Sequence, residues 1–391
     1  MKHPDAGSTT KNALILSGGG ARAAYQVGVL KAIAELLPKE AGNPFPIICG
    51  TSAGAINTAA LAIYGKNFSQ AVTLLLRVWA NFRVHHVFRT DFMGVLKNSA
   101  RWLGSLFRAS LGQGISRPVS LFDRAPLQSL LEKHLPCERI ALSISEGIVE
   151  SVCITASSYG SGKSISFYHS ASDTQQWSRA RRLGLPSAIT NQHLMASSAI
   201  PLVFSAIKLG RDYFGDGSMR QTAPMSPAIH LGADNLLVIG VASKPQRNGD
   251  DEDPVYPTFA QIGGHILNSI FIDNMEADLE RLQRINNTLQ LIPSHHLEEG
   301  GLSLRPVSVL AINPSQDLQQ IAAKHVMSLP RGLRFLLRML GAYGTKGSSL
   351  VSYLMFEKDY CRELIALGYA DAMARRQELI EFLGLEKNTA S

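Results

Sequence analysis

Two glycine-rich turns, each directly after a short apolar run, constrain the fold of this chain more than any other feature. Residues 18–22 (Gly-Gly-Gly-Ala-Arg) follow Ala-Leu-Ile-Leu, and residues 50–54 (Gly-Thr-Ser-Ala-Gly) follow Ile-Ile-Cys. Each turn leads into a run with helical spacing of its apolar residues. Strands that alternate with helices in this way predict a mainly parallel sheet covered by helices on both faces.

The second turn has the form G-x-S-x-G, in which a sharp strand-to-helix turn presents the serine. Gly50 and Gly54 flank Ser52, and glycine tolerates the crowded backbone of such a turn. The first turn opens a helix, whose free N–H groups suit a developing negative charge. Together the turns predict an acyl-transfer site with one nucleophile and one oxyanion hole, and a plain glycine-rich turn is the alternative.

Residues 18–23 also fit G-x-G-x-x-A, a variant of the dinucleotide-binding fingerprint. That fold needs an acidic residue at the end of the next strand to hold the ribose. Here the next strand ends in Gly50, Thr51 and Ser52, and Glu35 falls inside the preceding helix. The spacing therefore disfavours a dinucleotide, and the lack of a following Gly-Lys-Ser/Thr excludes a P-loop.

Composition points to a compact enzyme-like protein. The chain has 391 residues, of which 45% are hydrophobic and 18% charged, and its net charge is +7. The positive excess suits an anionic surface such as phospholipid headgroups, and no zinc-finger or RNP-type motif indicates nucleic acid. Four scattered cysteines predict buried free thiols. With no apolar signal core near Met1, and with glycines breaking the uncharged stretch 47–65, we expect a cytoplasmic protein without a transmembrane helix.

Periodicity predicts six strands and six helices, followed by a mostly helical C-terminal third. The strands cover residues 12–17, 47–49, 147–156, 164–169, 236–241 and 308–312, and the helices cover residues 21–37, 53–64, 68–84, 121–134, 191–198 and 259–285. The expected fold is a three-layer α/β/α arrangement. Residues 12–245 would form its core, and residues 246–391 a helical extension packed on that core in one continuous domain.

The base that would activate Ser52 is harder to find. Eleven histidines leave a Ser-His-Asp triad open, although His295, His296 and His325 lack a turn context. Asp216 is better placed, because it lies between two glycines directly after an apolar segment. A simple structural turn is the alternative for this aspartate.

Four motifs, taken in order, resemble those of the patatin-like phospholipases. They are residues 17–22 (S-G-G-G-A-R), 50–54 (G-T-S-A-G), 196–201 (A-S-S-A-I-P) and 216–217 (D-G). The resemblance covers about residues 12–222 and extends, as in bacterial members, through residues 270–285 and 307–317. It implies hydrolysis of a lipid carboxylic ester, of phospholipase A or lysophospholipase type, through an acyl-enzyme. An esterase or acyltransferase on the same residues, or a catalytically silent membrane-binding scaffold, are the alternatives.

The resemblance also implies a role for each motif residue. Ser52 is the nucleophile and Asp216 the base, with no histidine, no metal and no organic cofactor. The oxyanion loop comprises Gly18, Gly19, Gly20, Ala21 and Arg22, and the nucleophile turn comprises Gly50, Thr51, Ala53 and Gly54. Two positions depart from the family pattern, since Ala23 and Ser218 stand where glycine is usual. An unperturbed aspartate base predicts no inflection of the pH–rate profile between about 5 and 8, although apolar neighbours such as Phe214 could raise its pKa.

Two basic stretches predict contact with an anionic membrane surface. Residues 82–117 and 324–346 interleave arginine and lysine with aromatic and aliphatic residues. Surface helices with their apolar faces on the core are the alternative. A metal site is not indicated, because the spacing of such sites is absent at His85 and His86 and in the acidic run 250–253. Tyr25 and Trp79 are expected in the core. The sequence does not indicate an oligomeric state.

Overall fold

The computed structural model describes residues 10–89, 120–242, 256, 258–293, 304–342 and 348–385. Its strands are β1 (Asn12–Leu16), β2 (Ile47–Thr51), β3 (Ser151–Ser158), β4 (Ser164–Ser170), β5 (Trp177–Arg179), β6 (Arg182–Pro186), β7 (Ile207–Leu209), β8 (Asp212–Asp216), β9 (Asn235–Ile239) and β10 (Ser308–Ile312). The helices before β9 are η1 (Gly20–Ala23), α1 (Ala24–Leu36), α2 (Ala53–Tyr64), α3 (Phe68–Trp79), η2 (Val84–His86), α5 (Ala125–His134), α6 (Arg139–Ser145), α7 (Asn191–Ser197), η3 (Gly217–Met219) and α8 (Ser226–His230). Those after β9 are α9 (Phe259–Asn268), η4 (Ser269–Asp273), α10 (Asn274–Gln290), α12 (Leu318–His325), η5 (Val326–Ser328), α13 (Arg331–Met339), α14 (Ser348–Leu354), α15 (Lys358–Ala374) and α16 (Arg376–Leu383).

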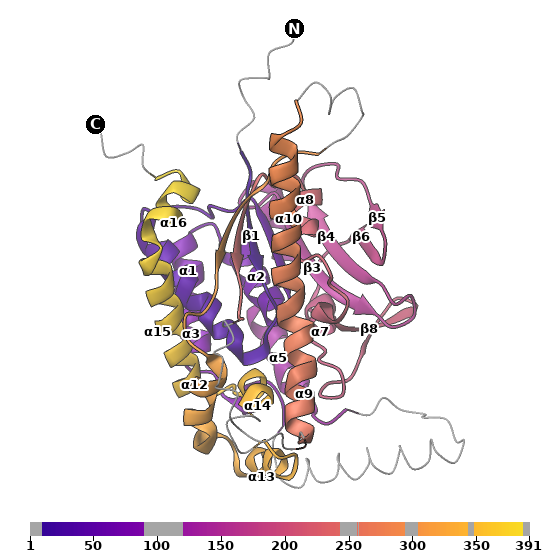
Figure 1. Cartoon of the computed structure of the whole chain (residues 1–391), viewed down its shortest axis with the longest axis vertical. Helices are drawn as coiled ribbons and strands as arrows, with labels where there is room; N and C mark the ends of the chain where they lie inside the picture. The colour runs from indigo at the N-terminus through magenta and orange to yellow at the C-terminus, as the bar shows by residue number, and fades with distance from the viewer. Residues whose placement is uncertain are drawn as a thin grey trace.

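One mixed sheet runs through the molecule in the order β10-β9-β1-β2-β3-β4-β6-β5 (Figure 1). The five strands from β10 to β3 are parallel, which is the arrangement that the alternating strand and helix pattern predicts. Beyond β3 the sheet becomes antiparallel where β4 and β8 join it. The short strands β5 to β8 were not predicted, because hairpins of three to five residues leave too little periodicity to detect.

Strand β3 determines where the candidate site forms. It pairs in parallel with β2 as far as Thr51 opposite Thr155, and its next residue, Ala156, pairs with Asp216 of the antiparallel strand β8. The end of β2 and the end of β8 therefore meet at consecutive residues of β3. This register brings Ser52 and Asp216 together across a sequence separation of 164 residues.

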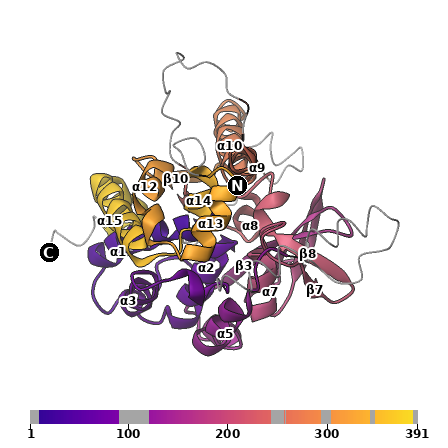
Figure 2. The ribbon, with the colours of Figure 1, turned by 90° about the horizontal axis from the view of Figure 1, so that it is seen from below.

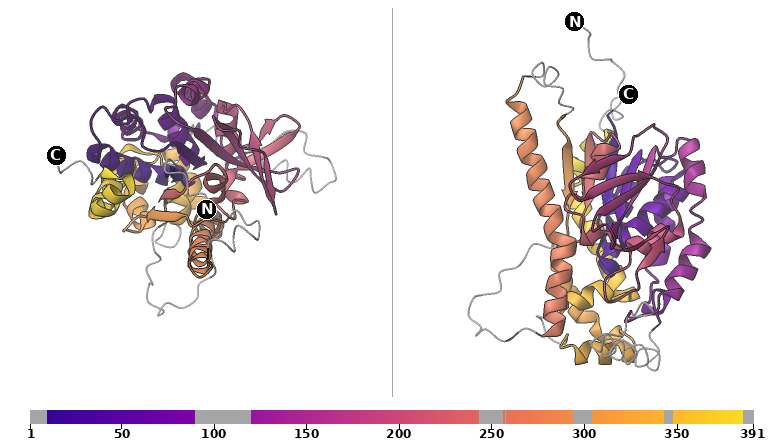
Figure 3. Two further views of the ribbon diagram at one scale, coloured as in Figure 1. Left: turned by 90° about the horizontal axis from the view of Figure 1, so that it is seen from above. Right: turned by 90° about the vertical axis from the view of Figure 1, so that its right-hand side faces the viewer.

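Helices cover both faces of the sheet, so the predicted three-layer α/β arrangement is confirmed (Figure 3). Along β1, Leu14 and Leu16 pack on the side of α1, α2 and α3, while Ala13 and Ile15 pack on the side of α8 and α10. The alternation follows from the two-residue period of a strand. All four cysteines are buried and free, as predicted.

The C-terminal third lies against the core, and part of it enters the sheet. Strand β10 pairs with β9, and α15 lies along α1, where the Tyr25 hydroxyl donates to Asp371 at 2.9 Å. Tyr25 and Trp79 are buried, as predicted. The expected helix 259–285 is interrupted by the π-helical turn η4 and ends later, at Gln290. A division of the chain at residue 245 stays a prediction.

Several helix ends differ from the sequence prediction. The predicted helix 121–134 begins only at Ala125, because the Asp123 carboxylate accepts the Ala125 N–H and Pro126 follows in the first turn. Helix α3 ends at Trp79, and its predicted last turn is loop. No helix in the described part of the chain combines the length and the apolar content needed to cross a membrane.

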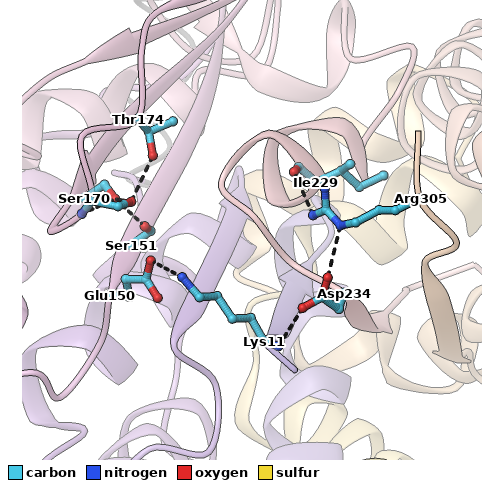
Figure 4. Close-up of polar contacts among 9 residues, drawn as sticks. Lys11, Glu150, Ser151, Ser170, Thr174, Ile229, Asp234 and Arg305 are labelled. Carbon is cyan, nitrogen blue, oxygen red and sulfur yellow. Dashed lines mark hydrogen bonds and ion pairs between the residues drawn. The ribbon is translucent and has the colours of Figure 1, made fainter. Parts of the chain in front are cut away.

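A polar cluster ties together the strand ends opposite the candidate site (Figure 4). The Lys11 ammonium lies 2.7 Å from Glu150, and the Lys11 N–H donates to Asp234 at 2.9 Å. Arg305 donates to the other oxygen of Asp234 at 3.0 Å. Lys11, Glu150 and Asp234 directly precede β1, β3 and β9, and Arg305 lies three residues before β10, so the cluster links the amino-terminal ends of these four strands.

Candidate active site

Ser52 occupies a strained turn between β2 and α2. Its φ of 56° and ψ of −127° lie in a region that side-chain-bearing residues rarely adopt. Gly54 lies so close to the end of β1 that a Cβ there would approach the Leu16 carbonyl oxygen to 2.3 Å. Glycine at position 54 therefore allows the first turn of α2 to pack against the strand that leads into the glycine loop, as the G-x-S-x-G pattern predicts.

The segment 196–201 holds this turn and the aspartate in place. The Ser197 hydroxyl accepts the Ser52 N–H at 2.8 Å and donates to the Thr155 carbonyl at 2.6 Å. Two residues later, the Ala199 carbonyl accepts the Asp216 N–H at 2.9 Å. One short segment of small residues thus positions both predicted catalytic residues.

Ser52 and Asp216 form a direct hydrogen bond in a buried site. The Ser52 hydroxyl donates to Asp216 Oδ2 at 2.6 Å, and the Ser218 N–H donates to Oδ1 at 3.0 Å. Asp216 is fully buried and Ser52 is 1% exposed. The structure therefore brings together the two residues that the sequence selected from separate motifs, and no histidine in the described part of the chain bonds to Ser52 Oγ.

Burial raises the pKa of Asp216 to about 6, and hydrogen bonds from Ser52 and Ser218 and the charge of Arg124 only partly oppose this shift. A carboxylate with that pKa is ionised at neutral pH and is still a stronger base than an ordinary aspartate. The inflection near pH 6 that follows differs from the flat profile expected for an unperturbed aspartate. The pH profile alone therefore does not distinguish an aspartate base from a histidine.

Arg124 is a site residue that sequence reasoning missed. Its guanidinium is 5% exposed, donates to the Met195 and Ser205 carbonyls at 2.9 Å each, and lies over the Phe204 ring. Burial lowers the pKa of Arg124 to about 10, so it is still a cation at neutral pH and favours the ionised form of Asp216. The signal in sequence is slight, because a lone arginine before a helix usually lies in solvent.

The acid limb of the pH–rate profile is predicted to respond to Arg124. With a soluble short-chain ester, kcat/KM should fall below about pH 6 as Asp216 becomes protonated. Arg124→Met removes a cation that favours the ionised form of Asp216. The pKa of Asp216, and with it the pH at which kcat/KM falls to half, should therefore rise by about one pH unit. Profiles of kcat/KM measured from pH 4.5 to 9 test this shift, and identical limbs would show that Arg124 does not act on Asp216.

The glycine loop faces the nucleophile. Gly20 and Ser52 line the same cavity, and Gly20 adopts φ +55°, which favours glycine. Gly20 and Ala21 open η1, so their N–H groups have no carbonyl one turn earlier to bond. Arg22 is buried beneath the loop, with its side chain directed to Ser352. The start of η1 therefore borders the cavity that Ser52 lines, and the oxyanion role of this loop stays a prediction.

The two departures from the family pattern have different surroundings. Ala23 is fully buried in η1. Ser218 donates both its N–H and its hydroxyl to Asp216, and a Cβ at Gly18 would lie only 2.4 Å from the Ser218 oxygen. The extra hydroxyl therefore lies between the carboxylate and the glycine loop and stabilises the ionised aspartate.

An apolar cavity leads away from Ser52. Ala53, Ile56 and Ala60 line it from one face of α2. The opposite walls come from α3, α5 and the loops around them, and consist of Leu74, Leu75, Val78, Trp79, Phe82, Val87, Leu127, Leu130, Leu131, His134, Leu135, Ile200, Phe204 and Phe356. The sequence did not predict this cavity, because its walls come from segments far apart in the chain.

The other predicted features lie away from this centre or outside the described residues. His325 contacts Glu363 at 2.6 Å on the C-terminal helices, and His295, His296 and the acidic run 250–253 are outside the described residues. Most of the basic stretch 82–117 is also outside them. Residues 324–342 of the second basic stretch form the end of α12, η5 and α13.

Comparison with known proteins agrees with the motifs. Human calcium-independent phospholipase A2-gamma is 24% identical over 223 residues, which are 56% of this chain and 25% of that protein, so the chain spans about a quarter of this relative. Among solved structures, VipD from Legionella pneumophila is 14% identical with a TM-score of 0.29, over 91% of this chain and 66% of that one. The ExoU-SpcU complex of Pseudomonas aeruginosa is 17% identical with a TM-score of 0.27, over 97% and 78%. The patatin-like phospholipase family model matches residues 14–229, more than half of the chain, and the chain therefore belongs to this family.

Proposed function

We propose that this chain is a lipid acyl hydrolase that cleaves carboxylic esters by a Ser52–Asp216 dyad. The observation that carries the proposal is the 2.6 Å hydrogen bond between Ser52 and a buried carboxylate at the head of an apolar cavity. Family membership supports a hydrolase acting on lipids. The raised pKa of Asp216 supports its role as the base.

The reaction follows from the positions of these groups. Asp216 takes the Ser52 hydroxyl proton as Ser52 Oγ attacks the ester carbonyl carbon, and the N–H groups at Gly20 and Ala21 bind the oxyanion. The tetrahedral intermediate collapses, the C–O bond to the alcohol breaks, and Asp216 returns the proton to that alcohol. Water then attacks the acyl-enzyme with Asp216 as base, which releases the carboxylic acid and restores Ser52.

The cavity indicates a fatty acyl group as the part of the substrate that the protein binds. Its walls are apolar, and it follows α2 from Ser52 to Ala60. Eight helical residues rise about 12 Å, which matches an extended acyl chain of roughly ten carbons. Burial of each methylene contributes about 0.8 kcal/mol, so medium and long chains should be preferred over acetyl or butyryl esters.

Release of free fatty acid is the experiment that tests this proposal. Vesicles of phosphatidylcholine with phosphatidylglycerol, and micelles of lysophospholipid and of a long-chain monoacylglycerol, would be incubated with wild type and with Ser52→Ala. We expect fatty acid from wild type only. Transfer of the acyl group to an added alcohol, seen as a new ester in place of free fatty acid, would favour an acyltransferase. No release from any lipid or short ester would contradict the proposal and favour a silent scaffold.

A basic and apolar face at one end of the molecule is proposed to contact anionic lipid. Helix α13 buries Leu333 and Leu337 and exposes Phe335 and Met339. Its cationic side chains are Arg331, Arg334 and Arg338, and residues 324–342 contain no acidic residue. The absence of acid and the presence of exposed apolar groups on one helix are typical of a segment that lies in a membrane interface.

Helix α9 continues this face without any charge. Phe259, Ile262 and Ile266 follow one side of α9 and are all exposed. The Ala260 N–H donates to the Leu340 carbonyl at 2.9 Å, which places the start of α9 beside the end of α13. In Figure 1 α13 lies below the sheet, and Figure 2 shows α13 and α9 from that end. Ser52 directly follows the carboxyl end of β2. We call this surface the α9–α13 face.

Removal of the α13 charges is predicted to weaken binding to anionic vesicles. Each arginine near an anionic surface contributes about 1 kcal/mol, so a triple replacement of Arg331, Arg334 and Arg338 by Ser should lower the partition coefficient about a hundredfold at low salt. Sedimentation with phosphatidylglycerol vesicles measures it. A charge-matched control replaces Arg179, Arg181 and Arg211, which are exposed on turns of the antiparallel strands. Docking through this face would be contradicted if both triple variants lost vesicle binding equally. It would also be contradicted if wild type sedimented equally with neutral and anionic vesicles.

A further inference from the structure

The glycine loop rests on a helix that lies more than 300 residues away in the sequence. Arg22, the last basic residue of η1, donates from Nε and Nη2 to the Ser352 hydroxyl of α14 at 2.9 and 2.7 Å. Its guanidinium lies over the Tyr353 ring, 3.9 Å from the ring centroid. A Cβ at Gly20 would approach the Tyr353 carbonyl oxygen to 2.3 Å, so the loop backbone is in direct contact with α14.

These α14 residues are themselves held on several sides. The Ser352 hydroxyl donates to the Ser349 carbonyl at 2.6 Å, which leaves its lone pairs oriented toward Arg22. The Tyr353 hydroxyl donates to Asn268 of α9 at 2.9 Å, and the Tyr353 ring stacks on Phe271 of η4. Arg22, Ser352 and Tyr353 are all buried. The support of the loop is therefore rigid and has little freedom to relax.

The charge of Arg22 is also preserved by this arrangement. Its partners are a neutral hydroxyl and an aromatic face, and among the described residues no carboxylate forms an ion pair with it. A buried cation without a counter-ion keeps a positive potential around the loop that follows Ser17. An anion that develops on the reacting oxygen would be stabilised by this potential, while an uncharged ester would gain little from it.

We propose that Ser352 and Tyr353 are positioning residues for the reaction, which set the oxyanion loop through Arg22 and thereby stabilise the transition state. The inference rests on the proposed function, since it concerns the same loop. Helix α14, which lies outside the residues that match the family model, would then affect turnover through Arg22. The effect should appear in kcat and not in KM, because the loop acts on the charge that forms only during reaction.

The test compares two serines of the same helix. Ser352→Ala removes the acceptor for Arg22, while Ser349→Ala removes a hydroxyl whose partners in the described part of the chain are Gly264 and Asn268 of α9. With a soluble ester, Ser352→Ala should lower kcat about tenfold to a hundredfold with KM within about twofold, and Ser349→Ala should change neither by more than about twofold. The rate at which an alkyl fluorophosphonate phosphonylates Ser52 should fall by the same factor in Ser352→Ala, because that reaction also places negative charge in the loop.

A second pair of variants separates positioning from simple loss of packing. Tyr353→Leu removes the ring over Arg22 and should lower kcat as Ser352→Ala does, whereas Tyr353→Phe keeps the ring and loses the bond to Asn268, so its kcat should lie between those of wild type and Tyr353→Leu. Circular dichroism and thermal unfolding are recorded for every variant. Equal kcat for Ser352→Ala and Ser349→Ala, or a lowered kcat that tracks only the unfolding temperature across all four variants, would overturn the positioning role. A wild type that neither hydrolyses esters nor labels would instead contradict the proposed function.

Discussion

Asp216→Asn is expected to abolish turnover while it leaves the fold intact. The amide can accept the Ser218 N–H through its oxygen and donate to the Ser52 hydroxyl through its nitrogen, so the contacts with Ser52 and with the Ser218 N–H are kept. What is lost is the ability to take the Ser52 proton. Loss of a positioned base lowers the rate by up to about ten-thousandfold, so we expect kcat to fall at least about a thousandfold with little change in KM.

The same variant is expected to be more stable than wild type at neutral pH. Burial raises the pKa of Asp216 from 3.8 to about 6, so above pH 6 the folded protein holds a buried charge that the unfolded chain carries more easily. A raised carboxyl pKa lowers stability as pH rises between these two values, and the full penalty is about 3 kcal/mol. Asparagine does not titrate, so its variant should unfold at higher urea concentration at pH 7.5.

The control is the pH dependence of the difference in stability between Asp216→Asn and wild type. Urea unfolding of wild type and Asp216→Asn should differ most above pH 6.5 and converge toward pH 4, where the folded carboxyl is neutral and the unfolded one is near its ordinary pKa of 3.8. Ser52→Ala, which removes the nucleophile but not the charge, should be inactive without this pH-dependent gain. If Asp216→Asn is inactive but its gain in stability over wild type is no larger at pH 7.5 than at pH 4, Asp216 is not held ionised in a buried site.

Ala60→Phe is expected to change the length of acyl chain that the protein accepts. Ala60 lies on the cavity face of α2, about two turns beyond Ser52, and is 3% exposed. A phenyl ring there would fill the far part of the cavity and exclude about four methylenes of a long chain. At about 0.8 kcal/mol each, kcat/KM for a dodecanoyl ester should fall about a hundredfold, while that for a butyryl ester should stay near wild type.

Graded replacements keep this prediction independent of folding. Ala60→Ser retains the space and should keep the wild-type chain-length profile, and Ala60→Val should fall between Ser and Phe. Hydrolysis of p-nitrophenyl esters with four to sixteen acyl carbons would be measured for each. A uniform loss at all chain lengths in Ala60→Phe, or a profile that does not change across the three variants, would place the acyl chain outside this cavity.

Local patterns predicted the parts of the site that depend on neighbouring residues. The strained turn at Ser52 needs glycine on both sides, and the loop at Gly20 needs a positive φ, so both leave a signature in the sequence. The parallel core strands are long apolar runs and were found for the same reason. The fold class and the family followed from these signals.

The remaining parts of the site depend on contacts between distant segments. Arg124 comes near Asp216 only because the start of α5 contacts α7, where Arg124 donates to the Met195 carbonyl, and Ser352 meets Arg22 across 330 residues. A single arginine or serine has no spacing that indicates such a partner. The raised pKa of Asp216 has the same origin, since burial is a property of the whole packed structure and not of the Gly-Asp-Gly sequence.

The most direct test of the account is the site at which a fluorophosphonate reacts. Wild type, Ser52→Ala and Asp216→Asn would be treated with an alkyl fluorophosphonate, digested, and examined by mass spectrometry for the modified peptide. We predict a single stoichiometric adduct on Ser52 in wild type, none in Ser52→Ala, and labelling at least about a thousandfold slower in Asp216→Asn. Labelling of another serine, or undiminished labelling in Asp216→Asn, would contradict a Ser52–Asp216 dyad.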